Sequence, residues 1–144
     1  MGISEVIKML VVIGVLLICS YTDIREKKVS IWIIITGVQA VIVLNFITKD
    51  ITMINALLGG IIGLLLIGVS KLTKNALGLG DAMLIAMIGL ALGMFNTLLA
   101  LFYALLITAV VSAILLVFKR VKKQSQMPFV PFILLGYLGV IFSW

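Results

Sequence analysis

The sequence predicts an all-α integral membrane protein with six transmembrane helices, and three observations support this. Of the 144 residues, 64% are hydrophobic and 11% are charged, whereas soluble domains contain roughly 45–50% apolar residues. The mean hydropathy is +1.39. The apolar residues form six runs separated by short polar segments. Because a spanning helix needs about 20 apolar residues, six short spans account for residues 1–144 as a single membrane-embedded domain.

Each apolar run defines one expected span. The spans are predicted at residues 3–21, 31–47, 51–69, 81–95, 97–118 and 128–144. The third contains Gly59, Gly60 and Gly63, small residues that let another helix approach closely. The first run is not expected to be a signal peptide, because residues 22–25 make a poor small-residue cleavage site and further spans follow.

The basic residues predict the orientation. The loops after spans one, three and five hold nine of the eleven Lys and Arg residues: Arg25, Lys27, Lys28, Lys71, Lys74, Lys119, Arg120, Lys122 and Lys123. The opposite side holds Lys8 and Lys49. Because short cytoplasmic loops are enriched in Lys and Arg, these three basic loops are expected in the cytoplasm and both termini outside. The net charge of +6 then reflects membrane topology and anionic lipid rather than nucleic acid.

Histidine is absent and Cys19 is the single cysteine. This composition excludes His-based triads, His/Cys zinc sites and an internal disulfide. We therefore expect no metal and no cofactor. Cys19 lies inside the first apolar run, where a cysteine usually behaves as a small buried hydrophobe.

Asp23 and Asp81 are the candidate catalytic residues. Asp81 begins a strongly apolar run and Asp23 ends the first one, positions in which a carboxylate is costly unless it has a function. The predicted orientation places both on the cytoplasmic face. Two carboxylates a few ångströms apart share one proton. One can then activate a water while the other hydrogen-bonds the scissile carbonyl, as in aspartic proteases.

Gly78 and Gly80 precede Asp81. Lacking a Cβ, they permit a positive φ and let a substrate backbone approach closely. Simpler structural roles stay open for both acids. Asp81 would serve as a helix N-cap, and Asp23 as a solvated loop residue or an ion-pair partner of Arg25 or Lys27. The remaining acidic residues are expected to be solvated: Glu5, Glu26 and Asp50.

Three segments resemble the motifs of the type IV prepilin peptidases. Asp23-Ile24-Arg25, followed by Lys27-Lys28-Val29-Ser30, is similar to the first aspartate motif. Gly78-Leu79-Gly80-Asp81 matches the second, glycine-any-glycine-aspartate. Pro128-Phe129-Val130-Pro131-Phe132 resembles the late Pro-Phe segment at the start of the last helix. Two positions depart from the family pattern: Ser30-Ile31 replaces the usual Pro-Asn, and Met83 replaces a frequent Lys.

The resemblance implies a plasma-membrane aspartic endopeptidase acting on prepilin or pseudopilin substrates. Such an enzyme removes the leader peptide at the cytoplasmic face, after a glycine and just before a hydrophobic stem. Asp23 and Asp81 would be its catalytic pair, with Gly78 and Gly80 supporting the backbone around them. Longer family members also methylate the new N-terminus, and many carry paired cysteines. With one cysteine and a first span beginning near Met1, this chain is expected to cleave without methylation.

Other functions stay open at this stage. A small ion-coupled transporter or channel subunit would use Asp23 and Asp81 as ion or proton sites, usually at the midplane of broken helices. A non-catalytic membrane assembly subunit would tolerate Asn at both positions. Intramembrane proteases of the presenilin type share the glycine-any-glycine-aspartate motif. The Pro-Phe segment and the small size favour the prepilin peptidases over them.

Overall fold

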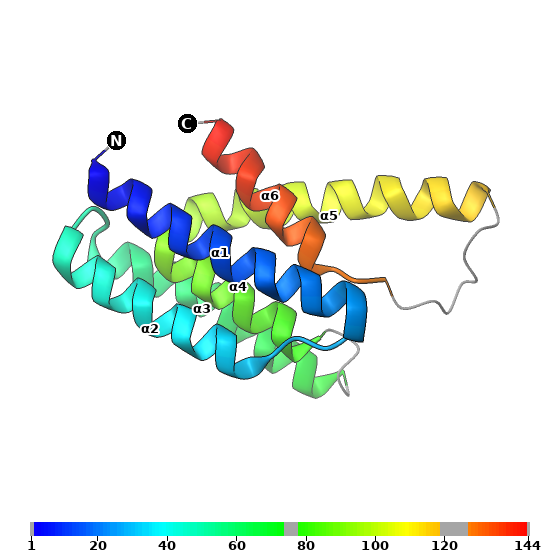
Figure 1. Ribbon diagram of the computed structural model, residues 1–144, viewed down its shortest axis with the longest axis horizontal. Coiled ribbons are helices and arrows are strands. Elements are labelled where there is room, and N and C mark those ends of the chain that lie inside the picture. The colour runs from blue at the N-terminus through cyan, green and yellow to red at the C-terminus, as the bar shows by residue number, and fades with distance from the viewer. Residues whose placement is uncertain (1, 74–77, 119–126, 144) are drawn as a thin grey trace.

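The computed structural model describes residues 2–73, 78–118 and 127–143, and all regular structure in this part of the chain is helical. Its six helices follow the order of the apolar runs: α1 Ile3–Glu26, α2 Ile31–Thr48, α3 Met53–Leu72, α4 Leu79–Leu92, α5 Met94–Val117 and α6 Val130–Phe142. The two ends of the described chain lie at one end of the bundle, and the α1–α2 loop lies at the other (Figure 1). The all-helical prediction is confirmed.

The helices differ in length. Only α1, α2, α3 and α5 among the described elements are long and apolar enough to cross a membrane. Helices α4 and α6 have 14 and 13 residues, which corresponds to about 20 Å at 1.5 Å per residue. Four candidate spans make a multi-pass membrane protein, while the crossing of α4 and α6 stays a prediction.

Helix α1 is longer than expected. Its predicted end was residue 21, but it continues to Glu26 and closes at Lys27, whose backbone adopts the left-handed conformation at φ 52°. The Lys27 N–H donates to the Asp23 carbonyl at 3.0 Å, and the Thr22 hydroxyl donates to the Cys19 carbonyl at 3.0 Å. The extra turn places Asp23 inside a helix instead of in the polar loop. Cys19 is fully buried in the core, as expected.

Glycines bring α3 and α4 into close contact, the most extensive between any two helices of the described chain. A Cβ added at Gly59 would collide with the Gly89 carbonyl oxygen, and one at Gly63 would collide with Ala86. The predicted role of these α3 glycines in close helix packing is confirmed. At the end of α4, Gly93 takes a φ of 81° and joins it directly to α5.

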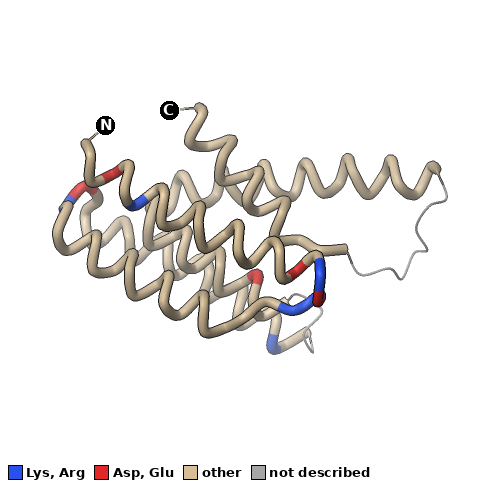
Figure 2. The backbone as a smooth tube through the Cα atoms, viewed as in Figure 1, with Lys and Arg blue, Asp and Glu red and all other residues tan. Residues whose placement is uncertain are grey.

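Charged residues gather at the two ends of the bundle (Figure 2). At the end that holds the termini, Lys8 is 4% exposed and donates to Asn45 Oδ1 at 3.2 Å. Lys8 also pairs with Asp50 at 3.9 Å, which leaves the Asp50 side chain 15% exposed. Asp50 as a whole residue is exposed, in line with the expectation, although its carboxylate also serves as the partner that the buried ammonium of Lys8 needs. Five of the nine basic loop residues lie outside the described residues: Lys74, Lys119, Arg120, Lys122 and Lys123.

Candidate active site

A pocket of about 850 Å³ opens at the end of the bundle that holds the α1–α2 loop. Its size is within the range of small-molecule and cofactor sites, roughly 300–1,000 Å³. Polar groups line one part of it: Asp23, Lys27, Lys28 and Asp81. Apolar side chains from α3, α5 and the segment before α6 line the rest, among them Leu66, Leu101, Leu105, Met127 and Phe129.

Asp23 comes from the last turns of α1 and is 8% exposed. Its Oδ2 accepts a hydrogen bond from the Val130 backbone N–H at 3.2 Å, in a buried setting. Arg25 does not pair with it, because the guanidinium donates to the Tyr21 hydroxyl at 2.8 Å and lies over that ring. The alternative of a solvated loop residue for Asp23 is therefore wrong.

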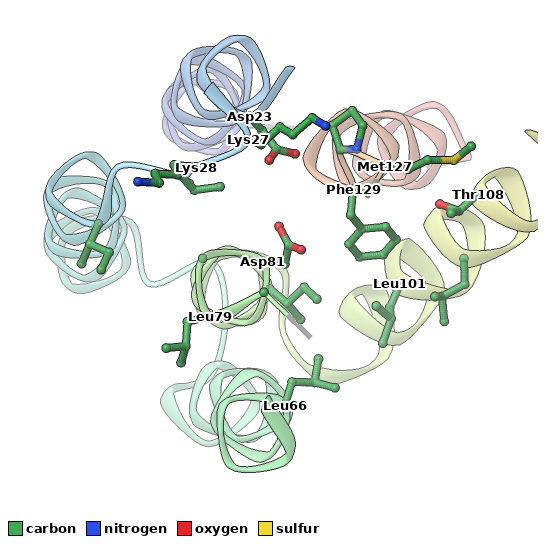
Figure 3. A pocket seen from close by; sticks show the side chains of 17 residues that line it. Asp23, Lys27, Lys28, Leu66, Leu79, Asp81, Leu101, Thr108, Met127 and Phe129 are labelled. Carbon is green, nitrogen blue, oxygen red and sulfur yellow. The ribbon is translucent and has the colours of Figure 1, made fainter. Parts of the chain in front are cut away.

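Asp81 is the third residue of α4, and the N-cap of that helix is Gly78. The alternative role of Asp81 as N-cap is therefore wrong. The Asp81 side chain is partly buried and lines the same pocket as Asp23. Figure 3 shows the two carboxylates pointing toward each other across the pocket, with the Phe129 ring beside them. Residues from α1 and α4, far apart in sequence, thus meet at one site.

The two glycines serve the site through their small size. Gly78 has a φ of −59°, and Gly80 lies within α4, so positive φ values, which the sequence suggested, are not used. A Cβ at Gly78 would lie 2.8 Å from Asp81 Oδ2. A Cβ at Gly80 would lie 2.7 Å from the Cβ of Val29 in the α1–α2 loop. Both glycines therefore permit close contacts within the chain itself.

Sequence reasoning missed three contributors to the pocket. Lys27 and Lys28 line it, although on the sequence alone they had no place in the site beyond the resemblance to the first aspartate motif and, for Lys27, an ion pair with Asp23 as one alternative. The backbone of Val130 contacts Asp23 directly. The last span was predicted to begin at residue 128, whereas α6 begins at Val130 and carries Pro131 in its first turn. Because Pro131 has no backbone N–H, the sequence indicates that the first turn of this helix has one donor fewer than usual.

The chemistry available in the pocket is that of the carboxylates. Within the described ranges, no group of three His, Cys, Asp or Glu side chains is arranged to hold a metal ion. Two facing carboxylates can hold a water between them, one taking its proton and the other donating one. Lys27 and Lys28 also line this pocket.

A comparison with models of known protein families shows which family this chain is related to. The model of the type IV leader peptidase family matches residues 10–113. The chain belongs to this family. The matched region includes both Asp23 and Asp81, and it ends before the Pro-Phe segment.

A curated relative supports the same assignment. The chain is 31% identical over 137 residues to the "Prepilin leader peptidase/N-methyltransferase" of Bacillus subtilis (strain 168). The alignment covers 94% of this chain and 55% of the relative, so the chain spans about half the length of the protein it matches. No solved structure shows a significant match.

Proposed function

We propose that this chain is a membrane aspartic endopeptidase that removes leader peptides from type IV prepilin-like proteins. The observation that carries the proposal is the meeting of Asp23 and Asp81 across one pocket. In the proposed reaction, one carboxylate takes a proton from a water, which attacks the scissile carbonyl. The other, protonated, donates a hydrogen bond to the carbonyl oxygen.

The position of the pocket suits a substrate with a basic leader and an apolar helix. The pocket lies at one end of the bundle, and its lining passes from charged to apolar side chains. The apolar stem of a substrate would stay in the bilayer, and its leader would lie in the aqueous phase. We propose that this end faces the cytoplasm, because Arg25, Lys27, Lys28 and Lys71 lie there and Lys8 and Lys49 lie at the other.

The transporter or channel alternative receives less support. Acids that carry ions normally lie near the membrane midplane in broken helices. Asp23 is within one turn of the end of α1, and Asp81 is in the first turn of α4. A non-catalytic assembly subunit would have a structural reason to bury Asp23, as the acceptor for the Val130 N–H, but none to point Asp81 toward it across a pocket.

Asp23→Asn and Asp81→Asn should each reduce cleavage by roughly 10³-fold or more, because the two acids act as one unit. The double variant should be no worse than either single variant. The measurement is the size shift of candidate prepilins co-expressed with each variant. Glu26→Gln is the matched control, since Glu26 is an exposed acid at the end of the same helix, three residues after Asp23, and should be silent. Near-normal cleavage by either Asn variant would contradict the two-aspartate mechanism.

We further propose cleavage without methylation. Cys19 is the single cysteine of this sequence, whereas many methylating members of the family carry paired cysteines. The product made by purified protein with substrate and S-adenosylmethionine should have a free, unmodified N-terminal amine. Mass spectrometry of that product checks this, and a protein-dependent gain of one methyl group would contradict it.

A further inference from the structure

The start of α6 leaves one backbone donor in need of a distant partner. The first N–H groups of a helix have no partner within it. Pro131 has no N–H, and Phe132 and Ile133 both donate to the Phe129 carbonyl, at 3.0 and 3.1 Å. The remaining donor is the N–H of Val130, a residue with no exposed surface. A buried N–H requires an acceptor.

That acceptor is Asp23. No side chain caps α6 from its own N-cap residue, Phe129. Asp23 Oδ2 takes this role from α1, across 107 positions of sequence and at 3.2 Å. The simplest interpretation is a tertiary helix cap, which satisfies a buried donor and favours negative charge at the helix N-terminus. The same bond also fixes the side chain of a proposed catalytic residue.

The two carboxylates are therefore not equivalent. In the described part of the chain, no hydrogen bond reaches the Asp81 side chain, whereas Asp23 Oδ2 is committed as an acceptor. The titratable groups around Asp23 are Asp81 of α4, Cys19 one turn earlier, and Lys27 and Lys28 at the pocket. The lone pair of Asp23 Oδ2 that accepts the Val130 N–H is not available to bind a proton. A proton shared by the two carboxylates is therefore better placed on Asp81.

We propose that the Val130 backbone N–H is a positioning group that holds Asp23 as the unprotonated, water-activating carboxylate. Asp81 then carries the proton and donates to the substrate carbonyl. This assignment rests on the proposed function, because it divides the roles within the proposed aspartate pair. The late Pro-Phe segment would thus contribute to catalysis through its backbone.

The sharpest test replaces the Val130 amide with an ester, by incorporating the matching α-hydroxy acid at position 130 of the full chain. This removes the N–H and keeps the side chain. The kcat for a prepilin substrate should fall about tenfold or more, the range for a hydrogen bond to a charged group. KM should stay within about twofold, because substrate binding is not touched.

The matched control is the same ester at Ile133. Its N–H donates to the Phe129 carbonyl in the same helical turn and does not contact Asp23. Both esters remove one N–H donor from the start of α6. The Val130 ester also makes the Phe129 carbonyl a weaker acceptor for the N–H groups of Phe132 and Ile133, so it should lower Tm somewhat more than the Ile133 ester. Only the Val130 ester should lower kcat. Unchanged kcat in a folded Val130 ester, or equal losses in both esters, would overturn the proposal.

A second measurement does not depend on cleavage. Infrared spectra of protein labelled with ¹³C at its Asp carboxyls report the carbonyl stretch of a protonated carboxyl, assigned to Asp81 by its loss in Asp81→Asn. The frequency of this band should shift in the Val130 ester and stay constant in the Ile133 ester. A band that is insensitive to both esters would overturn the assignment. If the unmodified protein cleaves no substrate, the proposed function fails, and this spectrum still decides the role of Val130.

Discussion

Val29 and Gly80 meet at the rim of the pocket, where the α1–α2 loop lies against the first turn of α4. All three heavy atoms nearest to a Cβ built at Gly80 belong to the Val29 side chain, at 2.7 to 3.4 Å. Such spacing leaves no room for a methyl group without movement of one segment. The glycine therefore sets the distance between the loop that follows Asp23 and the helix that carries Asp81.

Gly80→Ala should reduce cleavage, because the new methyl group pushes the α1–α2 loop away from α4 and separates the two acids. Val29→Gly in the same chain removes all three close contacts and should restore part of the activity. A double-mutant cycle of the cleavage rates measures this coupling, with Val29→Gly alone as the control. Additive effects in the cycle would show that Val29 is not what Gly80 accommodates.

The two acids that line the pocket could be singled out from the sequence, but their surroundings could not be predicted. An acid beside an apolar run stands out in the sequence, because placing its charge in or near lipid is costly. The burial of Asp23 depends on the Val130 N–H, 107 positions away, and no local pattern encodes that contact. The environment of Asp81 likewise depends on where α4 begins. The N-cap is Gly78, so Asp81 lies in the first turn of the helix rather than at its cap.

At the scale of elements, α3 and α4 form the most closely packed pair. Gly59 and Gly89 face each other, so that a Cβ on either would collide with the backbone of the other helix. Backbone atoms cannot move aside as a flexible side chain can. Substitution at this contact must therefore separate the two helices, one of which carries Asp81.

Gly59→Ala should lower stability by about 1–3 kcal/mol, the usual cost of overpacking a close-packed contact. Gly68→Ala on the same helix is the control, because nothing lies within 4 Å of a Cβ at Gly68. That control should be neutral or slightly stabilising, since Ala favours helix over Gly. Thermal unfolding in detergent compares the two variants. Equal unfolding temperatures would contradict the close α3–α4 contact.

The order of the helices was predictable, and the ends of α2 were predicted to within one residue, but several other ends were not. Six apolar runs gave six helices, because hydrophobic length is a strong signal in membrane proteins. The last turns of α1 contain two polar residues, Thr22 and Asp23, and Asp23 accepts a hydrogen bond from the first residue of α6. Helix α4 ends early because Gly93 takes a left-handed φ and its neighbour Met94 donates to the Asn55 side chain.

At the scale of the whole molecule, the charges at the bundle ends predict the orientation in the membrane. In a Cys19→Ala background, single cysteines at Glu26 and Lys71 should be protected from an impermeant thiol reagent added to intact cells. A cysteine at Lys49 should react. All three native side chains are exposed, so accessibility depends only on the side of the membrane. Labelling of Lys71→Cys from outside would contradict the proposed orientation.

The short α4 and α6 have a consequence for the lipid around them. If both cross the bilayer, each falls about 10 Å short of a hydrocarbon core of about 30 Å. Hydrophobic mismatch of this kind is relieved when the bilayer thins locally around the short helices. Both helices begin at the pocket, so local thinning of the bilayer on that side would bring the aqueous phase to the two aspartates. Water for hydrolysis would then arrive through a deformed membrane surface, without a channel through the protein.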